Sequence, residues 1–252
     1  MKNNGFFGKT DPEFMAIKII RELELNINEP IDLYYVAEKL NIVIKKEKIK
    51  DGILGACKAV GLKRLIVIDP DIDNEGRERF TIAHEIGHVI EHHGVHCCRT
   101  EDFYWNSKGV SVEQDANLFA AELLMPSTSL ADIVKKNDIT MELIEKLASE
   151  RNVSVTAMAI KLVKLSTDPT VLIYFEGGKV KWASYSKNSD FVELKNTIMS
   201  DTFDGMKITK QYEASTFFDG MSDEATCWAE AKYFGNYKFY LCVVRLDDKE
   251  YD

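Results

Sequence analysis

The spacing of apolar residues divides the first 70 positions into two helices and three strands. The pair Asp11-Pro12 favours a helix start with proline at the first helical position, and apolar residues then recur at helical intervals through residue 25. Pro30 ends this pattern, and residues 31–42 predict a second amphipathic helix. Residues 43–49, 52–60 and 64–69 either alternate between apolar and polar side chains or are rich in β-branched residues, which predicts three strands.

The middle of the chain combines polar loops with longer helical patterns. Residues 70–79 are polar and predict a loop, and a histidine-rich helix follows it. Residues 94–110 lack a clear period and predict a long irregular stretch, whereas residues 111–126 have a helical pattern that ends at a proline. Residues 140–165 predict a helix, a short turn and a second helix.

The pattern of apolar and polar residues changes near residues 166–168. Residues 170–186 predict a β-hairpin with a Gly-Gly turn, and residues 238–246 predict a late apolar strand. We therefore expect a first domain over residues 1–166 and a small α+β module of unknown role over residues 167–252. The mixture of helices and short strands places the whole chain in the α+β class.

Composition and charge narrow the classes of protein. The 252 residues are 45% hydrophobic and 29% charged, as in soluble globular proteins. The formal net charge of −9 makes nonspecific binding to nucleic acid unfavourable. No apolar run is long enough to span a membrane, and the first 14 residues lack the apolar core of a secretory signal. We therefore expect a cytoplasmic protein whose five cysteines are reduced thiols.

Every histidine of the chain lies in one short segment, which continues into two cysteines. These histidines are His84, His88, His92, His93 and His96. The first two form an H-E-x-x-H pattern, in which histidines four residues apart share a helix face and can bind one metal ion. Glu85 lies about 100° around the helix, where it can reach a metal-bound water without being a ligand. The pattern therefore predicts one catalytic zinc ion per chain, with Glu85 as the base.

The H-E-x-x-H pattern also arises by chance, but the rest of the chain favours a metal site. The apolar residues of the same helix form a separate face, so the histidines are not needed for its packing. A third ligand is available among the acidic residues that follow, which are Glu101, Asp102, Glu113, Asp115 and Glu122. Glu113 is favoured because Asn117, four residues on, shares its helix face and can accept a hydrogen bond from a ligating histidine.

Several neighbouring signals support weaker hypotheses. His92 is one turn beyond His88, but three ligands and a water already fill a tetrahedral site. Another hypothesis is a second metal site or an oxidation sensor formed by His93, His96, Cys97 and Cys98. No C-x-x-C pair supports it. A wall or lid of the active-site cleft is predicted at Phe103, Tyr104 and Trp105.

The helix pair at residues 140–165 suggests DNA binding, but its second helix has no Arg, Asn or Gln to read bases, so structural packing is favoured.

Two segments of the chain resemble the ImmA/IrrE family of metallo-endopeptidases. The first contains Arg79-Phe80 followed by H-E-I-G-H at residues 84–88, and the second is E-Q-D-A-N-L-F-A-A-E-L-L-M-P at residues 113–126. The resemblance covers about residues 10–165, and residues 167–252 are only loosely similar to the more variable tail of the family.

The resemblance implies a zincin-like core in which His84, His88 and Glu113 bind zinc and Glu85 is the catalytic base. It also implies a substrate class, namely helix-turn-helix transcriptional repressors cut at one site, often in mobile elements or stress-response loci. The sequence is thus interpreted as a zinc endopeptidase that neither binds specific DNA nor enters a membrane, with the strand at residues 52–60 as an edge for extended substrate. The alternatives are a non-catalytic transcription regulator that binds DNA or a repressor, and a His/Cys metal or redox sensor.

Overall fold

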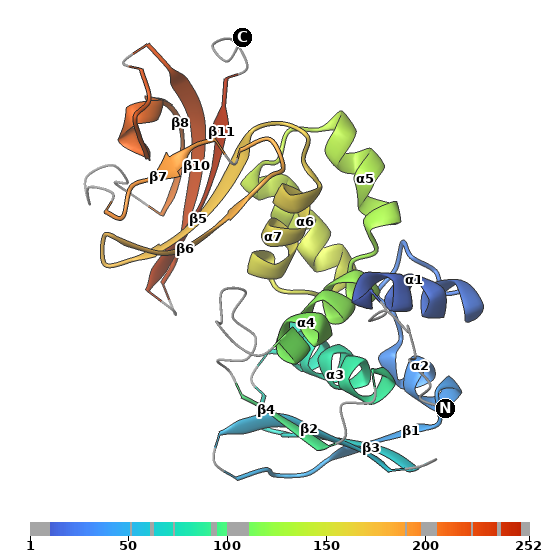
Figure 1. Cartoon of the computed structure of the whole chain (residues 1–252). Helices are drawn as coiled ribbons and strands as arrows, with labels where there is room; N and C mark the ends of the chain where they lie inside the picture. Colours follow the sequence, from blue (N-terminus) through green and yellow to red (C-terminus); the bar gives the residue numbers. More distant parts are fainter. Residues whose placement is uncertain are drawn as a thin grey trace, which may run out of the picture. The chain divides into compact units, whose positions relative to one another are not determined.

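The structure is a computed structural model that divides into two compact units (Figure 1). The first unit is Met1–Pro126 with Glu150–Ser154, and the second is Ser127–Ser149 with Val155–Asp252. The structure describes residues 11–50, 52–60, 63–72, 74–91, 95–99, 111–189, 191–197, 206–222, 224–235 and 238–247.

The first unit begins with two helices that start at capping aspartates. In α1 (Pro12–Glu22), Asp11 accepts the backbone N–H of Glu13 at 2.9 Å, and proline occupies the first helical position, as predicted. In α2 (Leu33–Lys39), Asp32 accepts the backbone N–H groups of Tyr34 and Tyr35 at 3.0 Å. Both caps satisfy backbone donors that the first turn of a helix leaves unpaired.

A four-stranded sheet and two helices form the core of the first unit. The strand order is β1-β3-β2-β4, with β1 parallel to β3 and the other pairs antiparallel. The strands are β1 (Ile42–Lys46), β2 (Ile53–Val60), β3 (Lys63–Ile68) and β4 (Val95–Arg99). Helix α3 (Glu75–Ile90) packs on β2 and β3, and α4 (Ser111–Leu124) packs against α3 (Figure 1). Three buried isoleucines, Ile66 and Ile68 of the sheet and Ile86 of α3, belong to this core.

Two segments predicted as loops contain regular elements. Helix α3 begins at Glu75, inside the polar segment at residues 70–79, because Asn74 accepts the Arg77 backbone N–H at 3.0 Å and acidic residues favour the first turn. Val95–Arg99, predicted to be irregular, is strand β4 and pairs with β2. Because β4 covers β2, the expectation that residues 52–60 form a sheet edge was wrong, and β4 is the outer strand.

The second unit combines three helices with an antiparallel sheet of order β6-β5-β11-β10-β8. Gly177 and Gly178 have φ of 57° and 74° and form the predicted hairpin turn between β5 and β6. The helices are α5 (Ser127–Lys136), α6 (Met141–Arg151) and α7 (Val155–Leu165), so the predicted helix–turn–helix is present. The sheet strands are β5 (Thr170–Glu176), β6 (Lys179–Tyr185), β8 (Lys207–Glu213), β10 (Thr226–Phe234) and β11 (Phe239–Leu246). A two-stranded ribbon of β7 (Glu193–Leu194) and β9 (Phe218–Asp219) and a 3-10 turn (Ala214–Thr216) complete it.

Helix α7 packs on β5 and β6, so it groups with the C-terminal sheet. This grouping describes which elements pack together. The boundary predicted near residue 166 concerns which part of the chain folds independently, and it stays a prediction. The predicted α+β class is confirmed by the seven helices and the mixed sheets of the described residues. None of the helices in the described ranges is long and apolar enough to cross a bilayer.

Candidate metal centre

Helix α3 places the two histidines of the H-E-x-x-H pattern side by side. His84 and His88 are one turn apart and fully buried, and their Nε2 atoms lie 2.9 Å from each other. The two rings are nearly perpendicular, with centroids 4.6 Å apart. Two imidazole nitrogens so close together present their lone pairs to one point in space.

Helix α4 adds a carboxylate to the histidine pair. Glu113 Oε2 lies 3.1 Å from His84 Nε2 and 3.2 Å from His88 Nε2. Asn117, one turn further along α4, has its Oδ1 at 2.9 Å from His84 Nδ1. An amide oxygen only accepts hydrogen bonds, so His84 donates from Nδ1 and keeps its Nε2 lone pair for a metal.

A glycine allows α4 to approach α3 this closely. A Cβ atom at Gly87 would lie 3.1 Å from Phe119 Cδ1 and 3.3 Å from Ala116 Cα. Both distances are tighter than ordinary van der Waals contact. Gly87 therefore allows the two helices to pack at this distance without displacing a neighbour, and the packing in turn sets the distance between the histidines and Glu113.

Strand β4 contributes a fourth candidate ligand, Cys98. Its Sγ lies 3.2 Å from His84 Nε2 and 3.9 Å from Glu113 Oε2. The ligand atoms of His84, His88, Cys98 and Glu113 all lie within 4.8 Å of one another. A tetrahedral ion with metal–nitrogen distances of about 2.0–2.1 Å keeps its nitrogen and oxygen ligands about 3.3 Å apart. The spacing of the His84, His88 and Glu113 ligand atoms, 2.9–3.2 Å, and the types of donor therefore fit zinc.

Glu85 lies beside this cluster and faces strand β2. Its side chain is fully buried, and neither carboxylate oxygen has a hydrogen bond of normal geometry to a described residue. Gly55 of β2 leaves space for it, because a Cβ atom there would lie 2.8 Å from Glu85 Oε1. Burial raises the pKa of Glu85 to about 7, although His84 and the thiols of Cys98 and Cys57 lower the pKa in part. Glu85 is thus a carboxylate poised near neutrality.

The ionisation of the candidate ligands matches the needs of a cation. Burial lowers the pKa of His88 to about 4, which keeps the imidazole neutral at pH 7. Burial alone would raise the pKa of Glu113, but its close contacts with His84 and His88 outweigh burial and hold the pKa well below its usual range. Burial raises the pKa of Cys98 far above its usual range, and a bound dication reverses this because a coordinating thiol is deprotonated.

His96 of β4 contacts the second carboxylate oxygen of Glu113, Oε1. Its Nδ1 lies 3.3 Å from Glu113 Oε1, and its ring stacks on that of His88 with centroids 4.4 Å apart at 10°. His96 and Cys98 therefore belong to this one cluster rather than to the separate site considered from the sequence, whereas Cys97 between them is exposed. The sequence of Val95–Arg99 carries no signal that could have assigned them, because its apolar Val95 is exposed and the segment is too short to show a strand pattern.

Several residues named from the sequence lie outside the described residues. Of the acidic candidates for the third ligand, Glu113 joins the histidines, whereas the placement of Glu101 and Asp102 is not described. The same holds for His92 and His93 and for the predicted cleft wall at Phe103, Tyr104 and Trp105.

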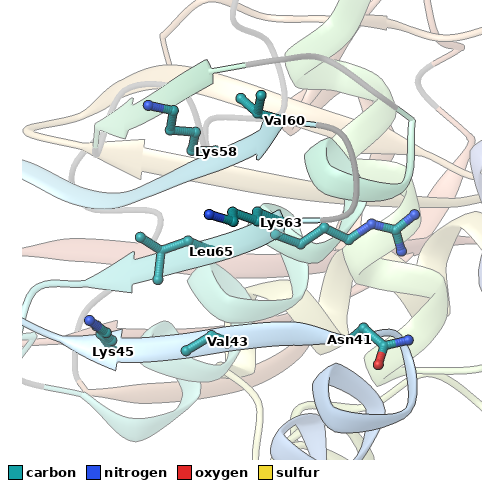
Figure 2. Close-up of a pocket in the computed structure, with 8 residues that line it drawn as sticks. Asn41, Val43, Lys45, Lys58, Val60, Lys63 and Leu65 are labelled. Atoms are coloured by element: carbon teal, nitrogen blue, oxygen red, sulfur yellow. The ribbon is translucent and has the colours of Figure 1, made fainter.

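A shallow hollow of about 670 Å³ lies on the opposite face of the same sheet (Figure 2). Most of its residues alternate along β1, β2 and β3 with the buried residues that face α3, so they point away from the histidines. Three lysines and three apolar side chains line most of it, namely Lys45, Lys58, Lys63, Val43, Val60 and Leu65. The hollow contains no candidate ligand and is separate from the cluster.

Comparisons with known proteins agree with this arrangement. Residues 37–163 match the model of the family described as Peptidase_M78, IrrE N-terminal-like domain. Curated proteins give no match to this sequence. Among solved structures, a Mycobacterium tuberculosis transcriptional regulator is similar with a TM-score of 0.62 at 11% sequence identity, over 94% of this chain and 76% of that one. At this identity the likeness shows a shared fold.

Proposed function

Because the chain belongs to the Peptidase_M78 family, whose domain is described as IrrE N-terminal-like, we propose that it is a zinc-dependent endopeptidase. Its substrate is a protein, namely a helix-turn-helix transcriptional repressor that it cuts at one site. The family supports a metallopeptidase-like role, and the site supports the zinc and the residues assigned below.

The observation that carries the proposal is the placement of a buried, unpaired carboxylate beside a three-ligand cluster. His84 Nε2, His88 Nε2 and Glu113 Oε2 lie within 3.2 Å of one another. A purely structural metal site has no need of Glu85, whose two buried oxygens have no hydrogen bond of normal geometry to a described residue. Burying a carboxylate in this way is costly, and functional sites are where such costs are found.

Each residue of the cluster has a separate task. His84, His88 and Glu113 hold zinc, and Asn117 and His96 orient His84 and Glu113. The zinc ion supplies Lewis acidity, which polarises a peptide carbonyl and lowers the pKa of water. Glu85 accepts a proton from the attacking water and delivers it to the leaving amine. The pKa of about 7 lets Glu85 exchange this proton near neutral pH.

Strand β4 is the element along which an extended substrate would lie. It is the outer strand of the four-stranded sheet, and it contains His96 and Cys98 of the cluster. A peptide that adds to a sheet edge gains main-chain hydrogen bonds and is held in the extended form that proteases cut.

A second candidate function is transcription regulation without cleavage, and the printed name of the similar solved structure favours it. Direct base reading by α7 receives no support, because residues 158–163 are buried in succession. This candidate therefore requires binding to a repressor or to DNA through another surface.

Paired variants of the two glutamates test the proposal. Glu85→Gln should retain zinc, because it keeps the shape of a residue that is not a ligand, and should reduce cleavage of a cognate repressor by about 10²–10⁴-fold. Glu113→Gln should instead lose zinc affinity. Metal content is measured by elemental analysis, and cleavage is measured on a candidate helix-turn-helix repressor.

The two functions give different results in this assay. Wild-type cleavage by Glu85→Gln would remove the catalytic assignment. Binding of the repressor by wild type and Glu85→Gln without cleavage by either would favour the regulator.

A further inference from the structure

We propose that Cys98 is a fourth protein ligand, which closes the metal site and keeps the enzyme latent until the thiol leaves the metal. The inference rests on the proposed function, since it concerns the same metal. It goes beyond that function by assigning a residue that an H-E-x-x-H site with a third carboxylate ligand does not require.

The first support is the position of the sulfur. A nitrogen and a sulfur bound to one tetrahedral zinc are about 3.6 Å apart, given metal distances of about 2.0–2.1 and 2.3 Å. Cys98 Sγ lies 3.2 Å from His84 Nε2 and 3.9 Å from Glu113 Oε2, on either side of this value. These two distances place the thiol close enough to His84 and Glu113 to share one tetrahedral ion with them.

The second support is the character of the resulting ligand set. Catalytic zinc sites have three protein ligands and an open position, whereas structural sites have four. With Glu113 alone, a divalent ion keeps one positive charge with which to polarise a carbonyl. A thiolate at Cys98 cancels that charge as well. Coordination by Cys98 therefore removes both the site for water and the electrostatic driving force for catalysis.

The third support is the element that carries the thiol. Strand β4 has five residues and pairs with β2 alone, as the outer strand of the described sheet. The pairing is irregular between Ile53 and Gly55, and Gly55 is the partner of Cys98. Bulges of this kind are frequent next to active sites, where they redirect a side chain. A local shift at this irregularity would withdraw the Cys98 thiol, while α3 and α4 keep the other three ligands in place and β4 stays in the sheet.

Cys57 provides a matched control within the same sheet. It is also buried, and it also lies near Glu85, as the effect of Glu85 on its pKa shows. However, it does not belong to the cluster of four ligand atoms. A buried thiol that merely fills the core should behave like Cys57 in every assay below.

The test uses the full-length protein loaded with cobalt(II), a spectroscopic substitute for zinc. A cobalt–thiolate bond gives a charge-transfer absorption band in the near ultraviolet. Wild type and Cys57→Ala should show this band, and Cys98→Ala should lose it while still binding one metal through His84, His88 and Glu113. With zinc, Cys98→Ala should cleave the cognate repressor at least several-fold faster than wild type.

Zinc-loaded wild type supplies a measurement that needs no variant. X-ray absorption should show one sulfur neighbour at about 2.3 Å. Only nitrogen and oxygen neighbours, or an unchanged cobalt band in Cys98→Ala, would overturn the ligand assignment and leave the proposed peptidase intact. A Cys98→Ala protein that loses the band yet cleaves no faster would overturn the closing role. Absence of metal binding by wild type would remove the proposed function itself.

Discussion

Replacing Gly87 by alanine tests whether the contact between α3 and α4 sets the geometry of the metal centre. Gly87 lies between Glu85 and His88 on α3, and its missing side chain faces α4. The new methyl would lie 3.1 Å from Phe119 Cδ1 and 3.3 Å from Ala116 Cα. The Phe119 ring can rotate only within a buried core, and the Ala116 backbone cannot rotate away at all.

Two opposing terms determine the effect on stability. Alanine in a helix interior is favoured over glycine by about 1 kcal/mol. An extra methyl in a tightly packed core costs about 1–3 kcal/mol. The net change should lie between about 0 and 2 kcal/mol of destabilisation, so the protein should still fold. Relief of the contact by separating the helices would move Glu113 by a few tenths of an ångström from both histidines.

Zinc affinity should therefore change more than stability does. Displacement of a supporting group typically costs about 10–100-fold in metal affinity, and we expect a loss of this size in Gly87→Ala. Competition with a chromophoric chelator measures the affinity, and urea unfolding of the metal-free protein measures the stability.

Gly235→Ala is the control for this experiment, because a Cβ atom there meets only Tyr233 at 3.7 Å. It should leave both quantities unchanged. A Gly87→Ala protein that is more stable than wild type and binds zinc equally well would refute the reasoning.

Four further predictions concern neighbouring features. Asn117→Ala should weaken zinc binding about 10–100-fold because His84 loses its acceptor, and an unchanged affinity in chelator competition would contradict this. Gly55→Ala should retain zinc but reduce repressor cleavage, because the new methyl would lie 2.6 Å from Thr81 Cγ2 and 2.8 Å from Glu85 Oε1 and displace both side chains; cleavage at the wild-type rate would show that Glu85 has room to adjust. Fluorescence polarisation with the upstream DNA of its own operon should detect no specific binding, and nanomolar binding at 150 mM salt would favour the regulator. A chain ended at Ser166 should still bind zinc, since the candidate ligands precede that residue; loss of the metal would disprove the predicted boundary.

The sequence predicted those elements whose signals are local. The Asp11-Pro12 start of α1 and the Gly177-Gly178 hairpin each depend on a few adjacent residues, and both are present. The pairing of His84 with His88 follows from helix geometry alone. Glu113 was chosen because Asn117 shares its helix face, and the structure places both residues at His84.

The elements that were missed depend on distant partners. Val95–Arg99 is too short to show a strand pattern by itself, and it is extended because β2 lies beside it. Without that strand, the buried side of Cys98 and the approach of His96 to Glu113 were not accessible from the sequence. The polar start of α3 was interpreted as a loop because a solvated first turn and a loop have the same composition.

The candidate ligands all lie in the first unit and come from three successive elements, a helix, a strand and a second helix. An ion bound to them acts as a cross-link that the unfolded chain cannot reproduce, so binding stabilises this unit and no other. At a free metal concentration one thousand times the dissociation constant, the stabilisation is about 4 kcal/mol. The C-terminal sheet has its own hydrophobic core and receives none of it directly. Metal supply would then set how long the first unit survives against cellular proteases, and the abundance of the protein would follow the zinc status of the cell.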